Sequence, residues 1–258
     1  MFTTVAFQES VDPAAVYNAL TAVADSHVTV AGDDLQIPEL NQLIMVAGGV
    51  DVTVESQLRL VAPSIRMRSR LQIEPLNTAS AAAVEPLSPH RVYDIADSPM
   101  QLVTGERMNA ETNSNPLAAQ IQWCVVWLAD GPIVPIRGAI FSVLATGTAT
   151  LVVSAWTDVP LTFDEDLPRG RYAVVGMRCR SAGCVAGRIF LPGSRWRPGV
   201  LGVDAQDDVE HWRFRNGEMG SFGEFEDTDT LTAQFLSTVA DTAEDVYLDL
   251  IQIRSGPG

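Results

Sequence analysis

Histidine and cysteine, the side chains that hold zinc or act as nucleophiles, are few and widely spaced in this chain. The histidines are His27, His90 and His211, and the cysteines are Cys124, Cys179 and Cys184. No histidine has another histidine or cysteine two to four residues away, which is the spacing that transition-metal sites use. The sequence therefore predicts no metal or other cofactor, with calcium at the acidic runs 164–166, 204–210 and 224–229 as the alternative to solvated turns. It also predicts three reduced thiols that behave as small hydrophobic side chains. A bridge between Cys179 and Cys184 across a hairpin is the alternative.

Carboxylates are plentiful, and two of them brought together would suit a glycosidase. Glu224 and Glu226 point to the same side of an expected strand, and Asp249 lies on another. Any acidic β-protein shows this pattern on its solvated face, which is the interpretation that we favour. Ser221 lacks the glycine two residues before it that a hydrolase elbow needs, and no histidine follows it. We therefore expect no enzyme.

Arginine is interleaved with aromatic residues in two segments of the C-terminal half. The segments are Arg195-Trp196-Arg197 and Trp212-Arg213-Phe214-Arg215. Because tryptophan and arginine are enriched at the centres of protein–protein interfaces, we predict that these residues form a subunit interface. A plain structural role is one alternative. Nucleotide stacking is another, but the acidic residues between 204 and 210 would repel a phosphate backbone.

The charge balance excludes one class of function. All seventeen basic residues are arginine, and they oppose 32 carboxylates, for a formal net charge of −15. Residues 1–58 contain no basic side chain. A cationic arm that neutralises nucleic-acid phosphates needs several basic residues close together, so no direct genome binding by such an arm is expected. No apolar stretch is long enough for a transmembrane segment, and the start does not resemble a signal peptide.

The first fifth of the chain shows a helical pattern. Asp12 before Pro13 is a helix-start signal, and apolar residues recur at helical spacing up to Ala24. A second, shorter helix is expected from Pro38 until Gly48-Gly49 ends it. The sequence therefore predicts an N-terminal helical extension over residues 1–50.

After residue 50 the pattern changes to short strands separated by glycine, proline and aspartate turns. Strands are expected at 52–60, 65–74, 121–128, 148–156, 172–180, 185–191, 210–215, 221–226, 231–236 and 246–253. The strand at 121–128 is apolar at nearly every position, which indicates burial on both faces. Residues 75–91 and 109–116 are expected to be exposed loops. This spacing predicts an all-β fold, an antiparallel jelly-roll β-sandwich over residues 51–258. Two sandwiches divided near residue 160 are the alternative.

Two segments resemble jelly-roll major capsid (coat) proteins of small or tailless icosahedral viruses. One is the expected hairpin of 170–178 with 186–193, and the other is 236–253, where a small polar turn leads into a last strand close to the C-terminus. A terminal strand in the middle of a sheet is typical of that family. The likeness is one of pattern over about residues 50–258.

The resemblance implies a self-assembling coat protein that forms an icosahedral shell. Its partners would be copies of itself in capsomers, together with other virion proteins. It would be located in the virion and assembled in the host cytoplasm. Many such proteins carry a basic N-terminal arm, which this chain lacks, so the expected N-terminal helix would instead tie neighbouring subunits together.

Two rival functions share the predicted fold. One is a non-catalytic, trimeric module that binds glycans or a receptor, such as a phage structural protein, with Trp196 and Trp212 as sugar-stacking platforms. The other is a glycosidase or lyase on a jelly-roll scaffold, which ranks third because no particular carboxylate pair is indicated.

Overall fold

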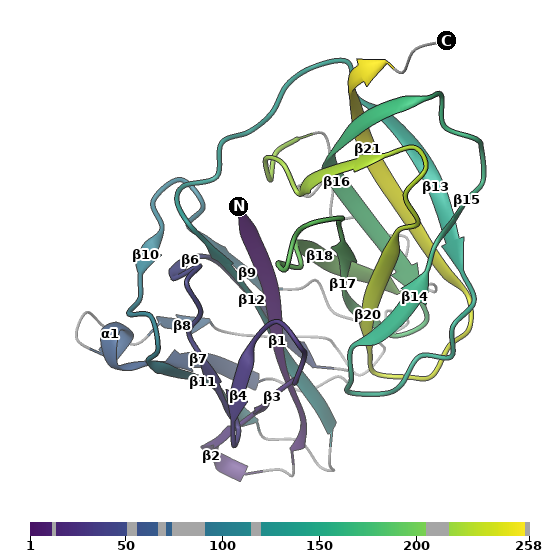
Figure 1. Ribbon diagram of the computed structural model, residues 1–258. Helices are drawn as coiled ribbons and strands as arrows, with labels where there is room; N and C mark the ends of the chain where they lie inside the picture. Colours follow the sequence, from purple (N-terminus) through teal and green to yellow (C-terminus); the bar gives the residue numbers. More distant parts are fainter. Residues whose placement is uncertain are drawn as a thin grey trace. The chain divides into compact units, whose positions relative to one another are not determined.

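The computed structural model describes residues 1–11, 14–50, 56–66, 71–73, 91–114, 120–204 and 217–255. Contacts within the chain define two compact units. The N-terminal unit is Thr4–Pro132, and the C-terminal unit is Met1–Thr3 together with Ile133–Gly258. Nearly all the regular structure is β-strand (Figure 1), and the single helix among the described residues is the four-residue α1 (Pro63–Arg66). The prediction of an all-β chain is confirmed.

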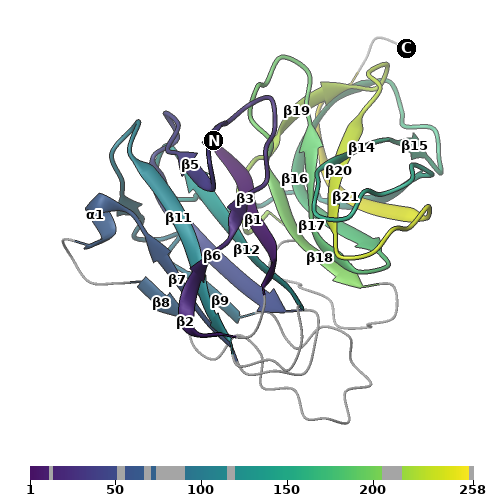
Figure 2. The same cartoon turned by 90° about the horizontal axis from the view of Figure 1, so that it is seen from below.

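The N-terminal unit contains two sheets (Figure 2). The first has the order β10 (Met100–Gln101), β6 (Gln42–Val50), β12 (Gln120–Ala129), β1 (Phe2–Val11) and β3 (Thr21–Ala22), with β9 (Arg91–Asp94) also paired to β6. The second has the order β4 (Thr29–Ala31), β5 (Asp34–Gln36), β11 (Arg107–Ser114), β7 (Ser56–Val61) and β8 (Leu71–Ile73), with β2 (Ala14–Ala19) also paired to β11. Long antiparallel ladders hold the sheets together, β12 with β6 in the first and β11 with β7 in the second.

The predicted N-terminal helices are wrong. Residues 14–19 form β2 and residues 42–50 form β6, so both expected helical segments are strands. Leu20 and Val23 are buried as the helical spacing requires, but Val16 is 60% exposed, so the three do not share one apolar face. Long-range pairing decides the outcome: β2 pairs with β11, and β6 pairs with β12.

Two strands of the N-terminal unit illustrate opposite kinds of sequence signal. β12 is buried along nearly its whole length, as predicted for a run that is apolar on both faces. β11 occupies a stretch that was expected to begin an exposed loop at 109. Met108, Ala110 and Thr112 of β11 are fully buried, whereas the alternate polar residues face away from them. Alternation, rather than overall polarity, therefore marks this strand.

The C-terminal unit is one nine-stranded sheet. Its order is β14 (Thr157–Pro160), β20 (Thr232–Ser237), β17 (Cys184–Phe190), β18 (Gly199–Asp204), β16 (Gly170–Ser181), β21 (Glu244–Ser255), β13 (Phe141–Gly147) and β15 (Thr162–Phe163), with β19 (Gly223–Glu226) also paired to β16. The last strand, β21, lies between β16 and β13 (Figure 1). The expectation that the terminal strand lies in the middle of a sheet is confirmed.

The strands predicted at 172–180 and 185–191 are present, but they do not pair as a hairpin. β18 lies between them, parallel to β16 and antiparallel to β17. A Cβ on Gly187 of β17 would lie 2.1 Å from the Sγ of Cys179 on β16, so the two strands pack face against face. The sheet thus folds back on itself at β18, and the absence of a side chain at Gly187 allows the close approach.

Among the remaining strand predictions, three are confirmed, one is wrong and one is partly wrong. Those at 221–226, 231–236 and 246–253 correspond to β19, β20 and β21. The strand expected at 148–156 is wrong, since this segment has only an isolated bridge at Val153. Residues 65–66 belong to α1 rather than to a strand, although β8 falls at the far end of the same prediction. The loop predicted at 75–91 lies outside the described residues except for Arg91, where β9 begins, and the strand predicted at 210–215 lies outside them.

Candidate contact surface

The predicted interface segment Arg195-Trp196-Arg197 lies in the loop between β17 and β18. Arg195 is exposed, whereas Trp196 and Arg197 are only 8% and 9% exposed. The guanidinium of Arg195 lies over the Trp196 ring at 4.2 Å, and that of Arg197 lies over the Phe190 ring at 3.6 Å. The structure therefore stacks these arginine and aromatic side chains on one another within one chain.

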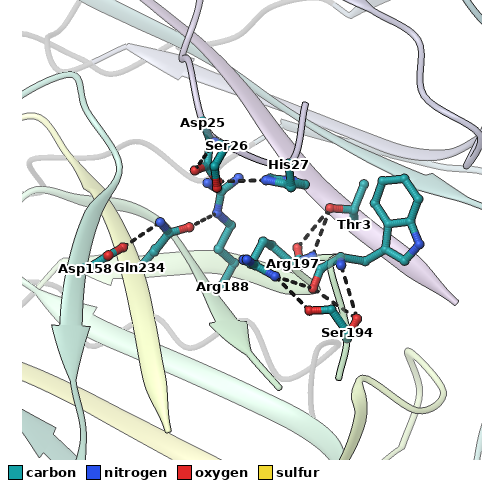
Figure 3. Close-up of polar contacts among 10 residues, drawn as sticks. Thr3, Asp25, Ser26, His27, Asp158, Arg188, Ser194, Arg197 and Gln234 are labelled. Atoms are coloured by element: carbon teal, nitrogen blue, oxygen red, sulfur yellow. Dashed lines mark hydrogen bonds and ion pairs between the residues drawn. The ribbon is translucent and has the colours of Figure 1, made fainter. Parts of the chain in front are cut away.

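Hydrogen bonds close this loop on itself (Figure 3). Arg197 Nη1 donates to the carbonyl oxygens of Ser194 and Trp196, at 3.1 and 3.3 Å. The Trp196 N–H donates to Ser194 Oγ at 3.1 Å, and the Arg197 N–H donates to Thr3 Oγ1 at 3.2 Å. Trp196 thus lacks the open ring face that a sugar-stacking platform needs. An interface role for Arg195 stays a prediction, and Trp212, Arg213, Phe214 and Arg215 lie outside the described residues.

Arg188, which the sequence did not single out, begins a chain of polar side chains that leads from the interior to the surface (Figure 3). It is fully buried in β17, and its guanidinium lies 3.7 Å from the centre of the Trp156 ring. Its Nε donates to Gln234 Oε1 at 2.7 Å, and Gln234 Nε2 donates to Asp158 Oδ1 at 2.6 Å. Side chains from β17, β20 and β14 are therefore linked across the sheet, from a buried cation to an exposed carboxylate.

The carboxylates considered for a glycosidase are engaged by other side chains. Glu224 pairs with Arg171 at 2.7 Å, and Glu226 pairs with Arg254 at 3.4 Å, in exposed or half-exposed positions. Asp249 is buried and accepts a hydrogen bond from Ser142. Within the described ranges no three histidine, cysteine, aspartate or glutamate side chains are arranged to hold a metal ion.

The three cysteines are buried and form no disulfide, as the sequence predicts. Burial raises the pKa of the Cys124 thiol well above its usual value. Burial also raises the pKa of Cys179, and the neighbouring Cys184 adds to the effect. Protonated, enclosed thiols are poor nucleophiles, so these cysteines pack rather than react.

A largely apolar surface lies on the C-terminal unit, where the loops 148–154 and 238–243 meet, and Asp241 is the one charged residue in these two loops. We call this area the valine surface after Val152, Val153 and Val239, which are 56%, 41% and 43% exposed. The chain has no charged residue between Arg137 and Asp158, and none between Asp229 and Asp241. The apolar run that resembled a buried strand is therefore exposed loop.

Backbone contacts hold the two loops of the valine surface side by side. The N–H of Leu151 donates to the carbonyl of Asp241 at 2.9 Å, and the N–H of Ser154 donates to the carbonyl of Ser237 at 3.1 Å. Val153 also forms a parallel bridge with Ser237. Ser154 has a positive φ of 60°, which a residue with a side chain rarely adopts. The surrounding contacts therefore fix one conformation of this surface.

Two carboxylates, whose pKa values shift in opposite directions, accept hydrogen bonds from the same loops. Glu244 is 1% exposed, its Oε2 accepts from the Ala149 N–H at 3.1 Å, and its Oε1 has no hydrogen-bond partner. Burial raises the pKa of Glu244, and the negative charge of Asp241 raises it further. The hydrogen bond from Ala149 lowers this pKa, but by less than burial raises it. Burial also opposes ionisation of Asp241, but donors at Ala182, Thr242 and Ser181 outweigh it and lower the pKa.

We predict that Glu244→Gln changes how stability depends on pH. Because the pKa of Glu244 is higher in the folded than in the unfolded protein, folding favours its protonated form, and wild type gains stability as pH falls from 7 toward the unfolded value of about 4.3. The glutamine variant lacks this gain. Urea unfolding of both proteins between pH 7 and 4.5 measures the difference, and a constant difference across that range would contradict the prediction. The stability that Asp241 provides has the opposite sign and is lost only at lower pH, as its depressed folded pKa is passed.

A polar cavity of about 640 Å³ opens on the N-terminal unit. Arg107, Asn109 and Glu111, alternate residues of β11, line it together with Asp33 and Asp34 from the β4–β5 turn. Asn109 lies where β11 changes partner from β5 to β2. Its Nδ2 donates to the carbonyl oxygens of Leu20 and Asp33, at 3.3 and 3.0 Å. The side chain thus supplies a hydrogen-bond donor to two backbone carbonyls at the point where β11 changes partner.

Charged pairs set the character of this cavity. Arg59 Nε donates to Glu111 Oε2 at 2.6 Å, and Arg107 Nη1 lies 3.9 Å from Asp34 Oδ2. The guanidinium of Arg59 also lies 3.7 Å from the centre of the Tyr17 ring. Closely spaced donors and acceptors of this kind suit a ligand with several hydroxyl groups. No aromatic side chain is among the described residues of the lining.

Comparisons with known proteins give little further guidance. No protein-family model matches the chain, and no curated protein sequence matches it. Among solved structures, the chain is similar to the crystal structure of the major capsid protein P2 from Bacteriophage PM2, with 10% identity and a TM-score of 0.26, over 99% of this chain and 100% of that one. A likeness of this size carries no argument about function. In the described part of the chain, no helix is long and apolar enough to cross a membrane.

Proposed function

We propose that this chain is a self-assembling structural protein, a coat protein of the jelly-roll class that forms an icosahedral viral shell. The observation that carries the proposal is the position of β21. The last strand pairs with β16 along nearly its whole length on one side, and with β13 over residues 244–250 on the other. This is the arrangement that the resemblance of residues 236–253 to coat proteins leads one to expect.

The same position gives a physical reason why the subunit suits a shell. A terminal strand usually frays unless it is tied down, whereas β21 is twelve residues long and bonded on both edges. Arg–aromatic stacks such as Arg188 with Trp156 and Arg178 with Tyr247 add links within the same unit. A rigid subunit loses little entropy on association, which favours the many weak contacts of a closed assembly.

Assembly of such a shell is expected to depend on salt. Each copy carries a formal charge of −15, so copies repel one another. At about 10 mM salt the Debye length is roughly 30 Å, and above about 0.3 M it falls to a few ångströms. We predict that the light-scattering mass of the purified protein rises across this range. A mass that stays at the monomer value throughout would contradict the proposal.

A glycan- or receptor-binding module is the second candidate function, and the polar cavity of the N-terminal unit favours it. Asp34, Asn109 and Glu111 provide the carboxylate and amide groups that hold sugar hydroxyls. This function requires a fixed small oligomer, such as a trimer, whose mass does not change with salt. The same light-scattering series therefore separates the two candidates.

A further inference from the structure

We propose that the valine surface is the place where two copies of this chain meet in a two-fold contact. This inference rests on the proposed function, because it names a contact through which the coat protein associates. It is carried by the exposure of Val152, Val153 and Val239, by the absence of charged residues from 138–157 and 230–240, and by the backbone hydrogen bonds that join the two loops.

Because the proposed function requires copies of this chain to meet, charge favours the valine surface as the place where they do. The chain has nearly twice as many carboxylates as arginines, so most ways of opposing two copies bring like charges together. A two-fold axis through the valine surface places the same largely apolar patch on both sides of the contact. The exposed side chains of Val152, Val153 and Val239 then face those of the second copy, and apolar area is removed from water.

The conformation of the surface also suits a preformed contact. Asp241, the charged residue of the 238–243 loop, is half-buried, and its carboxylate accepts hydrogen bonds from Ser181 and from the Ala182 N–H. Glu244, which accepts a hydrogen bond from the Ala149 N–H, is buried. These contacts hold the loops of the valine surface in place, so binding requires little further ordering of them.

A charge-exchange experiment tests the proposal on the full chain. Val152→Glu and Val152→Arg are made separately, and their self-association is measured by sedimentation at about 0.3 M salt. Each variant alone opposes like charges across the axis, so we expect its association to weaken at least about tenfold. An equimolar mixture pairs Glu with Arg and is expected to restore association. Val103→Glu, at a valine that is 61% exposed but outside this surface, is the matched control and should associate as wild type does.

The outcomes distinguish this inference from the function on which it rests. If wild type associates and both Val152 variants associate equally well, the valine surface is not the contact, while the coat function stands. If each variant fails alone and the mixture fails too, a second copy does not present the same patch, and the two-fold contact is overturned. If wild type is monomeric throughout, the proposed function itself is overturned. Thermal melting of each variant checks folding, and a solvent-exposed site should leave it unchanged.

Discussion

Replacing Arg188 by alanine is expected to lower the free energy of unfolding by about 2–5 kcal/mol, the cost of leaving a buried acceptor without its donor together with the cost of the cavity that a large buried side chain leaves. Arg188 is fully buried, stacks on Trp156 and donates to Gln234. Without it, the Oε1 of Gln234 loses its donor in a buried position, and a cavity is left beside the indole ring. Since whole domains are stable by only about 5–15 kcal/mol, the change should be evident in urea unfolding.

A double variant separates the charge from the space that the side chain fills. Arg188→Met with Gln234→Leu removes both partners and keeps an apolar side chain at each position. Complete replacement of a buried polar network by apolar groups is often close to neutral, so the double variant should recover much of the stability that the single variant loses. A cost below about 1 kcal/mol for Arg188→Ala would show that the network contributes little.

Trp196→Ala is expected to lower the free energy of unfolding by about 3–5 kcal/mol, the range for removal of a buried large aromatic side chain. Trp196 is 8% exposed and is covered by Arg195. The matched control is Arg195→Ala, which removes only the exposed cation over the ring and should cost about 0.5–1 kcal/mol.

The outcome for Trp196 decides between two positions of this residue. The sequence predicts that Trp196 lies in a subunit interface. If it does, the alanine variant keeps its stability and assembles poorly. The structure buries Trp196 within the chain, and in that case the variant loses stability even in dilute, unassembled protein. Urea unfolding below the concentration at which the protein assembles distinguishes the two. A urea midpoint of unfolding equal to that of wild type would support the interface position of Trp196 and contradict the buried one.

Sequence patterns predicted the strands that are recognisable from their own residues. β12 has apolar side chains on both faces, and β16, β17, β20 and β21 are bounded by turn residues, so each was located without knowledge of its partners. The central place of β21 was expected only from a resemblance of pattern, because nothing in a strand's own composition states which strands flank it.

The errors arose where a partner distant in sequence decides the structure. Residues 14–19 match a helical repeat, but β11, about ninety residues later, pairs with them as a strand. Residues 148–156 are as apolar as a buried strand, yet no neighbouring strand extends along them, and Val152 is left exposed. The hairpin error has the same origin, because the insertion of β18 between β16 and β17 depends on residues 199–204.

The candidate site was predictable by composition but not by location. The sequence identified arginine with aromatic residues as the informative combination, and the structure contains such stacks at Arg188, Arg195 and Arg197. Stacking on an aromatic ring stabilises a guanidinium group both when it is buried inside a chain and when it is exposed at an interface. Only burial separates the two, and burial depends on the tertiary fold. The polar cavity was missed because its lining residues are divided among Asp33–Asp34 and alternate positions of β11.

Electron microscopy of the purified protein in negative stain, at about 10 mM and about 0.3 M salt, tests the central claim most directly. A self-assembling coat protein predicts closed shells, or rings of five or six subunits, that become more abundant as salt screens the −15 charge of each copy. Uniform small particles that do not change between the two conditions would contradict the claim and direct attention to the polar cavity of the N-terminal unit.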